Sequence, residues 1–405
     1  MRALFNTYRR FPVEIVRGEG SYVFDREGQK YLDFTSGIAV LSLGHAHPDL
    51  VNVLKAQSEV LWHTSNLFSH PWQEALAEKL TEHSVFDRVF FVNSGAEANE
   101  AAIKLVRRYR WLKNGRITSE PAASPIIVFN QSFHGRTLGA LSATAQPTLH
   151  EGFTPLLDGF LALPYNDLNA LDAIHPDITA IMLELVQGEG GVRPADESWI
   201  RELVRRARRY EIPIIVDEVQ TGMGRTGTLF AYEGYGFEPD VITLAKGLGS
   251  GFPIGAMLAK EYLAEAFTAG THGSTFGGGP LATAVGGAVF DIIARDDFLT
   301  HVRSSSEKLR QGLDRLVQHE MTWEEAGLTL RGRGLLLGLA FSDLKGRTAE
   351  ERTAWWVEAL RVHGVLVLTA GRNVMRILPP LIISDKEIDL FLSSFQDVLQ
   401  TEMMD

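Results

Sequence analysis

Lys246 is the residue of this sequence best placed for covalent chemistry with a carbonyl group. It follows the apolar run 241–244, which predicts a strand, and it precedes the glycine-rich stretch 247–251. Glycines let a backbone approach a ligand closely. A lysine that is shielded from water beside another cation has a lowered pKa, so its amine can serve as a nucleophile and as a general base. Most lysines are only solvated surface charges, so the assignment depends on the motifs that accompany Lys246.

A strand-to-helix turn upstream has the features of a phosphate-binding site. The predicted strand 88–92 leads through Ser94, Gly95 and Ala96 into the helical stretch 101–112. Unpaired N–H groups and the positive end of the helix dipole attract phosphate, and Gly95 permits a close approach. An ordinary helix start with Ser94 as its N-cap would explain the same residues, so this motif alone leaves both readings open.

A carboxylate follows the most apolar predicted strand. Residues 212–216 are apolar throughout, which is typical of a central strand with both faces covered, and Asp217 comes next. In open α/β sheets, ligands bind beyond the carboxyl ends of the strands, although Asp217 could instead cap the following turn. Residues 222–227 match GxGxxG, but they do not open a helix, so we reject dinucleotide binding and expect a loop there.

A phosphate cradle, a strand-end carboxylate and a strand-end lysine together meet the needs of one cofactor, pyridoxal 5'-phosphate (PLP). Lys246 would hold the aldehyde of PLP as a Schiff base. Asp217 would keep the pyridine nitrogen protonated, which the ring requires in order to act as an electron sink. We therefore expect PLP as the cofactor and Lys246 and Asp217 as the catalytic residues.

The elements that must position these residues follow an α/β pattern. Short β-branched runs alternate with amphipathic helical stretches over residues 88–244, which predicts a largely parallel sheet between helices. Beyond about residue 295 the pattern changes to a helix, a glycine-containing strand at 331–341, another helix, and short strands at 365–368 and 375–378. This change predicts a smaller C-terminal α/β domain.

The length of 405 residues exceeds that of one ordinary core, so we expect more than one domain. The expected division is an N-terminal segment 1–45 that packs with the small domain, a large cofactor-binding domain 46–295 and a small domain 296–405. Function would then depend on the discrete motifs of the large domain and on a shared site.

Composition excludes several classes of function. Hydrophobic residues make up 45% and charged residues 22% of the chain, as in soluble globular proteins, and no stretch approaches the roughly 18 apolar residues of a membrane span. The absence of cysteine excludes disulfides and thiolate chemistry. A net charge of -11 without a long basic run argues against nucleic acid as a partner. Because the N-terminus lacks the apolar segment of a secretory signal, we expect a cytoplasmic location.

With these residues established, the sequence resembles the class III aminotransferases over roughly residues 12 to 400. The motifs that carry the resemblance are Leu43-Gly44-His45-Ala46-His47-Pro48, Ser94-Gly95-Ala96, Ser132-Phe133-His134-Gly135-Arg136-Thr137, Gln187-Gly188-Glu189-Gly190-Gly191-Val192 and Gly273-Ser274-Thr275-Phe276-Gly277-Gly278, with Asp217 and Lys246. The resemblance implies fold type I of the PLP enzymes, the aspartate-aminotransferase-like fold, with a large domain of mainly parallel sheet and a small α/β domain.

The resemblance also implies roles around the cofactor. Ser94, Gly95 and Ala96 would bind phosphate, Phe133 would stack on the pyridine ring, Val219 would back the other face of the ring, and Gln220 would bond the ring hydroxyl. Thr275 would reach the phosphate of the neighbouring subunit. Two complete sites would then require a homodimer.

For the substrates, the resemblance implies arginine pockets. Arg136 would grip one carboxylate, and Arg376 would grip the second carboxylate of glutamate or 2-oxoglutarate. Glu189 would pair with Arg376 when the substrate has no second carboxylate, which makes a switch between two substrates. Alternatively, Glu189 and Arg376 form a permanent structural salt bridge.

Ile38 favours one substrate among the terminal amines that the family uses. Similar ornithine aminotransferases carry a tyrosine at this position, where it contacts the free α-amino group. Ile38 cannot make that hydrogen bond, and an apolar residue suits a substrate whose α-amino group is acylated, because burying an unpartnered ammonium is costly. The stretch 63–68, with Asn66, also looks like the acetylornithine branch, and Ser274 and Asn66 would contact the substrate. We therefore expect N2-acetylornithine and 2-oxoglutarate as substrates, in arginine biosynthesis.

Other readings share the same motifs. Another terminal amine, such as GABA, ornithine, succinylornithine or an acylated lysine precursor, would use the same fold, as would an intramolecular aminomutase. A protein that binds PLP without catalysing a reaction is a third alternative, because it would have the same pocket residues as an enzyme. Leu185 replaces a proline and Gly279 an asparagine usual in the family, and both changes concern only local backbone geometry. His45 and His47 lack a further ligand motif, so we expect no metal.

Overall fold

The computed structural model describes residues 3–115 and 124–404, and its largest sheet has seven strands. In spatial order these are β4 (Arg88–Val92), β12 (Gly255–Ala259), β11 (Val241–Leu244), β10 (Ile214–Asp217), β7 (Ala180–Leu183), β5 (Ile126–Phe129) and β6 (Phe160–Leu163). β12 is antiparallel to both of its neighbours, and every other neighbouring pair is parallel. The predicted α/β class with a mainly parallel sheet is confirmed.

Both faces of this sheet are buried, because successive residues of its strands join different hydrophobic clusters. Ile214 and Val216 of β10 belong to one cluster, which includes residues of α7 (Glu197–Arg209) and α8 (Pro280–Ile293). Ile215 belongs to a second cluster, which includes residues of α4 (Gly95–Lys113). The uninterrupted apolar run that predicted a doubly covered strand therefore has this physical basis.

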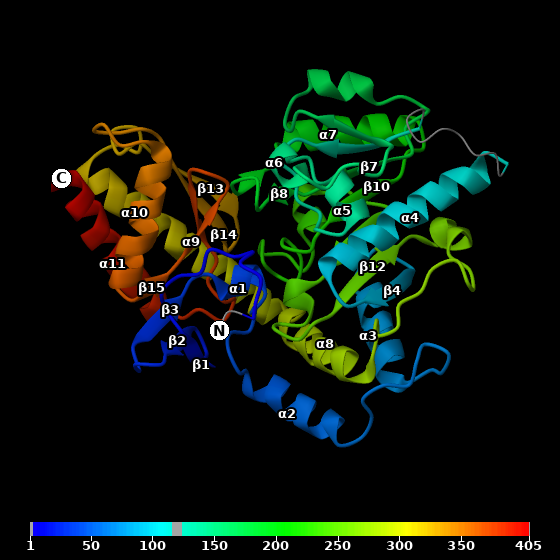
Figure 1. Ribbon diagram of the computed structural model, residues 1–405, viewed down its shortest axis with the longest axis horizontal. Coiled ribbons are helices and arrows are strands. Elements are labelled where there is room, and N and C mark those ends of the chain that lie inside the picture. The colour runs from blue at the N-terminus through cyan, green and yellow to red at the C-terminus, as the bar shows by residue number, and fades with distance from the viewer. Residues whose placement is uncertain (1–2, 116–123, 405) are drawn as a thin grey trace.

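The remaining elements complete two lobes (Figure 1). The helices are α1 (Ser36–Ala39), α2 (Pro48–Ser58), α3 (Pro71–Glu82), α5 (Leu138–Ala143), α6 (Pro147–His150), α9 (Asp296–Glu320), α10 (Ala349–Val362), α11 (Asp385–Met404) and the 3-10 turns η2 (Asn169–Ala173), η3 (Ala231–Tyr235), η4 (Lys246–Leu248) and η5 (Glu261–Ala266). The short strands β8 (Val186–Gln187) and β9 (Arg193–Pro194) form a separate pair. Within the described residues, no helix is both long and apolar enough to cross a membrane.

The N-terminal strands are joined to the C-terminal part of the chain. β1 (Ile15–Glu19), β2 (Tyr22–Asp25) and β3 (Lys30–Asp33) form a sheet whose fourth strand is β15 (Val365–Leu366), parallel to β3. Figure 1 shows these strands beside α10 and α11, apart from the large sheet. This pairing joins the N-terminal strands to the C-terminal part of the chain, and the boundaries 1–45, 46–295 and 296–405 stay a prediction.

Two predicted strands of the small lobe are wrong in detail. The single strand expected at 331–341 is a hairpin of β13 (Leu328–Arg333) and β14 (Leu336–Phe341), and Gly334 turns between them at φ 59°. The strand expected at 365–368 is divided between β15 and β16 (Leu368–Ala370), which belong to different sheets. A glycine with positive φ forms such a turn without strain. Because the residues around Gly334 are largely apolar, the sequence pattern predicted one continuous strand. β17 (Val374–Ile377) lies between β14 and β16, close to where a strand was predicted.

The carboxyl ends of three strands of the large sheet bring the three predicted motifs together. β10 ends at Asp217, which is in register with Thr243 of the parallel strand β11. Two residues beyond β11, Lys246 begins η4. β4 leads directly into α4 through Ser94, its N-cap. Because parallel strands end at one edge, motifs far apart in the sequence meet there.

A buried ion pair fastens the last helix to the small lobe. Both carboxylate oxygens of Glu402 in α11 accept hydrogen bonds from Arg352 in α10, at 2.8 and 3.0 Å, and one of them also accepts from the indole of Trp356 at 2.8 Å. The two charged side chains are 1% and 4% exposed. The pair therefore closes the small lobe around its core.

We expect Glu402→Ala to lower the free energy of unfolding by about 3 to 5 kcal/mol, because it leaves a buried guanidinium without its counter-charge. Urea unfolding followed by circular dichroism measures the change. The matched control is Glu358→Ala in the exposed pair with Arg361 on α10, which should cost less than about 1 kcal/mol. Equal losses in the two variants would contradict this account of the small lobe.

Candidate active site

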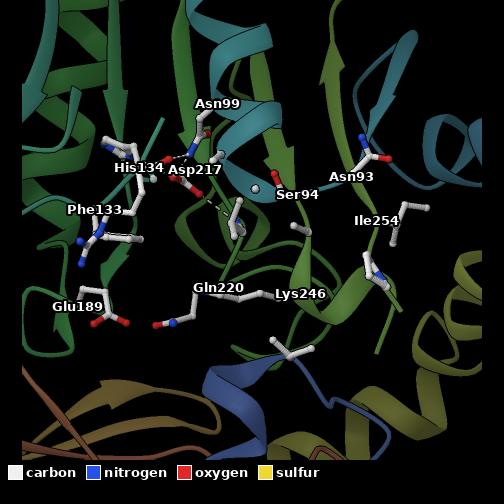
Figure 2. Close-up of a pocket in the computed structure, with 18 of the residues that line it drawn as sticks. Asn93, Ser94, Asn99, Phe133, His134, Glu189, Asp217, Gln220, Lys246 and Ile254 are labelled. Carbon is white, nitrogen blue, oxygen red and sulfur yellow. Dashed lines mark hydrogen bonds and ion pairs between the residues drawn. The ribbon is translucent and has the colours of Figure 1, made fainter. Parts of the chain in front are cut away.

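One cavity of about 470 Å³ lies at the carboxyl edge of the large sheet (Figure 2). The predicted residues on its wall are Ser94, Gly95, Ala96, Phe133, Arg136, Glu189, Asp217, Val219, Gln220 and Lys246. The structure thus brings together the phosphate, ring and lysine motifs, which come from separate parts of the sequence.

Lys246 stands at the start of η4 with a left-handed backbone at φ 40°. Such a conformation is strained for a residue with a Cβ and is often found at functional sites. Burial lowers the pKa of the Lys246 amine, against the opposing effect of the Glu189 carboxylate, and the positive charge of Arg376 lowers it further. Burial therefore makes the neutral amine more accessible here than on the protein surface.

Asp217 is held by three hydrogen-bond donors. Its Oδ2 accepts from Asn99 Nδ2 at 2.8 Å and from His134 Nδ1 at 2.7 Å, and its Oδ1 accepts from the Val219 N–H at 3.0 Å. Figure 2 shows Asn99 and His134 converging on this carboxylate. The bond to Val219 is the turn cap that the alternative reading of Asp217 expected, so this residue caps the turn and also faces the cavity. One lone pair of Oδ1 remains for a ligand.

The donors themselves are fixed in orientation. Asn99 Oδ1 accepts from the Thr243 hydroxyl at 2.7 Å, and its amide nitrogen donates also to the His134 carbonyl at 2.7 Å. His134 must carry its proton on Nδ1, because a carboxylate only accepts. Its Nε2 is buried and has no hydrogen-bond partner among the described residues. The ring is therefore oriented by its bond to Asp217.

The start of α4 has both of its predicted features. Ser94 is the N-cap, and its side chain accepts from the Glu97 N–H at 3.3 Å. A Cβ on Gly95 would lie 2.7 Å from a methyl group of Val219, so only glycine lets the helix begin this close to that side chain. The cavity at the helix N-terminus suits a phosphate group.

Gln220 gives an independent test of the fit to PLP. Its side-chain oxygen is buried at the cavity and has no hydrogen-bond partner among the described residues. A buried polar atom of this kind usually has a partner, and a ring hydroxyl or phenolate of a bound cofactor would provide one. With the helix N-terminus, the remaining lone pair of Asp217 and the amine of Lys246, the residues present fit PLP.

Glu184 is a cavity residue that sequence reasoning missed. Its carboxylate accepts from the Phe133 N–H at 2.9 Å, so it fixes the backbone of the predicted stacking residue. Burial raises the pKa of Glu184 well above its ordinary value, and the charge of Asp217 acts in the same direction, whereas the Phe133 N–H opposes both. Its position directly after β7 is the strand-end signal that identified Asp217.

Asn99, His134 and Thr243 were also missed as partners of Asp217. Asn99 interrupts the apolar face of α4 between Ala98 and Ala101, and a buried amide on such a face demands a partner. That signal indicates a polar contact without identifying it, because the contact joins residues 118 positions apart.

Glu189 and Arg376 form the ion pair that the family comparison predicted. Arg376 lies on β17 with its side chain 3% exposed, and Glu189 lies between β8 and β9 with its side chain 30% exposed. Arg376 also donates to the Thr369 carbonyl at 3.3 Å. Glu189 is on the cavity wall, so the pair links that wall to the small lobe.

Five predicted residues lie outside the wall of this cavity, and one of them is Arg376, which reaches the wall through its ion pair with Glu189. Ser274, Thr275 and Asn66 line a neighbouring cavity of about 920 Å³, where Asn66 donates to the Ser274 carbonyl at 3.0 Å. Ile38 is 37% exposed, whereas nearby Val40 is on the wall. A residue that completes the site of a neighbouring subunit must lie outside the cavity of its own chain. Thr275 meets this condition, and its contact with the neighbouring subunit stays a prediction.

The remaining sequence features have local explanations. His45 pairs with Asp33 at 2.8 Å, and no cluster of three potential metal ligands occurs in the part of the chain that the structure describes. Gly279 is the N-cap of α8 at φ -61°, a conformation that does not require glycine. Leu185, at the proline position, is fully buried.

Comparisons with known proteins agree with one another. Residues 4–399 match the family Aminotransferase class-III. An acetylornithine aminotransferase of Oceanobacillus iheyensis is 46% identical, with 98% of this chain and 95% of that protein aligned. An N-acetylornithine aminotransferase of Stenotrophomonas maltophilia has a TM-score of 0.82 at 36% identity, with 98% of each chain covered. An ornithine aminotransferase of Toxoplasma gondii, with PLP at its active site, has a TM-score of 0.91 at 30% identity, covering 100% of this chain and 94% of that one.

We expect Asn99→Leu to weaken PLP binding by the apoprotein about thirtyfold, because a hydrogen bond to a charged group is worth about 2 kcal/mol. Quenching of tryptophan fluorescence measures the affinity. The PLP analogue with carbon in place of the ring nitrogen should lose much less affinity, since Asn99 acts through Asp217 and that nitrogen.

Asn373→Leu is the control, because the amide of Asn373 donates to the Phe341 carbonyl in the small lobe, away from Asp217. PLP affinity should be unchanged in that variant. Equal losses for PLP and its carbon analogue in Asn99→Leu would show that Asn99 does not act through the ring nitrogen.

Proposed function

This chain belongs to the class III aminotransferase family, and we propose that it transfers the terminal amino group of N2-acetylornithine to 2-oxoglutarate. The products would be N-acetylglutamate 5-semialdehyde and glutamate, in arginine biosynthesis. The observation that carries the proposal is the convergence of Lys246, Asp217 and the N-terminus of α4 on one cavity. The acetylornithine aminotransferases that align along nearly the whole chain support this choice of substrate.

The enzyme depends on PLP, for which we propose the holding residues. When bound, the cofactor supplies an aldehyde that condenses with amines and a ring that withdraws electrons. Ser94, Gly95 and Ala96 would bind its phosphate, and Phe133 and Val219 would enclose its ring. Asp217, oriented by Asn99, His134 and the Val219 N–H, would hold a proton at the ring nitrogen.

Lys246 would act as the proton carrier. Burial lowers the pKa of its amine, which makes the neutral form more accessible. In that form, Lys246 Nζ would remove and return the proton of the substrate carbon that bears the amino group. The same residue would work in reverse for 2-oxoglutarate, so the two substrates would react in turn at one site.

Arg136 and Arg376 would sort the two substrates by their carboxylates. The Arg136 guanidinium lies 5.5 Å from the centre of the Phe133 ring, close to the proposed stacking position, and it would bind the carboxylate that the two substrates share. The Arg376 charge is occupied by Glu189 until a second carboxylate competes for it. Ile38, Ser274 and Asn66 would complete the substrate site.

The adjacent placement of Ser274 and Thr275 supports a homodimer. Both residues line the neighbouring cavity instead of the one around Lys246. In a two-fold dimer, the same residues of the partner subunit could complete each site. We propose that this dimer is the active form.

Addition of N2-acetylornithine alone to the purified yellow holoenzyme is expected to bleach its visible absorption, because the first half-reaction consumes the coloured form of the cofactor. Ornithine and GABA should bleach it more slowly, and Lys246→Ala should abolish turnover with every amine. Stopped-flow spectroscopy measures the rates. Faster bleaching by ornithine or GABA would overturn the substrate while leaving the family unaffected.

Glu189→Gln is expected to change the two half-reactions by different factors. Without the carboxylate, Arg376 stays available to dicarboxylates, so the acetylornithine half-reaction should slow by at least about tenfold relative to the glutamate half-reaction. Separate stopped-flow measurements with each substrate give the ratio. Glu197→Gln, in the exposed pair with Arg333, is the control. A uniform change in both half-reactions would identify the pair as a permanent structural salt bridge.

A further inference from the structure

Four consecutive residues that precede the cavity have left-handed backbones. Ser36, Gly37, Ile38 and Ala39 have φ values of 46°, 61°, 67° and 62°. Gly37 adopts this conformation freely, but the other three carry a Cβ that disfavours it, and Ile38 is also β-branched. Helix α1 is therefore a single left-handed turn, and other contacts must supply the free energy that keeps it in place.

Asp33 supplies the central contacts. Its Oδ1 accepts from the Thr35 N–H at 2.9 Å, from the Thr35 hydroxyl at 2.6 Å and from the Ser36 N–H at 3.1 Å. Its Oδ2 is 2.8 Å from Nε2 of His45. The Asp33 side chain is only 4% exposed, so these bonds form out of water, where an unpaired carboxylate would be costly.

The same turn is tied to the strand that carries Arg376. The Ser36 hydroxyl donates to the Leu378 carbonyl at 2.6 Å, and the Leu378 N–H donates to the Phe34 carbonyl at 2.8 Å. Leu378 is two residues beyond Arg376. On its other side, the turn leads directly to Val40 on the cavity wall.

We propose that Asp33 is a positioning residue for substrate selection. Its carboxylate holds residues 36–39 in the left-handed turn, which sets Ile38 and Val40 in a fixed relation to Arg376. This inference rests on the proposed function, because that function assigns Ile38 and Arg376 to the substrate. The left-handed turn and its contacts with Asp33 are independent of that assignment.

The chain offers a matched control in Asp25. This residue is 7% exposed in the neighbouring strand β2. Its carboxylate accepts from the Gln29 N–H at 2.7 Å and from the Tyr31 hydroxyl at 3.0 Å. Asp25→Ala therefore removes a buried carboxylate from the same sheet without a direct contact to the turn.

The kinetic test uses the holoenzyme with acetylornithine and with ornithine. We expect Asp33→Ala to lower kcat/KM for acetylornithine by tenfold to a hundredfold, mainly through KM, since misplaced contacts weaken substrate binding. The preference for acetylornithine over ornithine should fall in the same variant. Asp33→Asn keeps an acceptor for the backbone N–H groups and should restore part of both values, and Asp25→Ala should leave the preference unchanged.

A second test measures unfolding, and it remains usable if Asp33→Ala folds poorly. Ala39→Gly relieves one left-handed residue at small loss of buried surface, so it should raise Tm by about 2 °C. The change in Tm caused by Ala39→Gly should differ between the Asp33→Asn background and the wild type, because both substitutions act on one turn. In the Asp25→Ala background, Ala39→Gly should change Tm by the same amount as in the wild type.

The outcomes separate this inference from the proposed function. If the wild type does not use acetylornithine, the proposed function fails, while the unfolding cycle still tests whether Asp33 holds the turn. If the wild type prefers acetylornithine, but Asp33→Ala and Asp25→Ala change that preference equally, the positioning role is wrong. Strict additivity of Asp33→Asn and Ala39→Gly would also overturn it.

Discussion

The site depends on the hydrogen bonds that replace water around one buried carboxylate. Asp217 is 4% exposed, and taking a charge out of water costs several kcal/mol unless hydrogen bonds replace the lost solvent. Asn99, His134 and the Val219 N–H supply those bonds. Asn99 lies on α4 and is held in turn by Thr243 of β11. These bonds explain why α4, β10 and β11 must meet at one point.

Around that point, the two lobes divide the chemistry. The large lobe supplies rigid strand ends for the cofactor, because strands β10 and β11 are buried throughout. The small lobe supplies Arg376, which enters from β17 and meets Glu189 of the large lobe. The residues that we propose for the cofactor therefore belong to one sheet, whereas the ion pair of Arg376 and Glu189, which we propose for substrate selection, joins the two lobes.

The polar residues at the ends of the strands were predictable from the sequence, and the tertiary hydrogen bonds between them were not. Lys246, Asp217 and Ser94 could be located because apolar runs mark the strands and the ends of parallel strands share one edge. Glu189, Arg376 and the roles around the ring came from resemblance. The bonds that Asn99 and His134 make to Asp217 could not be assigned from the sequence, since a buried amide on an apolar helix face indicates a polar contact but not its distant partner. The left-handed turn at 36–39 was also hidden, because Gly37 is its only glycine, and the hairpin at Gly334 was masked by apolar neighbours.

The tie between Ser36 and Leu378 joins residues 342 positions apart. During synthesis at about 5 to 20 residues per second, the N-terminal segment therefore waits roughly 20 to 70 s for its partner to leave the ribosome. The large sheet has all of its strands by residue 259, so the cofactor cavity can form first. The tie between the turn at 36–39 and Leu378 is therefore completed last, and in a nascent chain the edge of β3 that pairs with β15 has no strand partner until then.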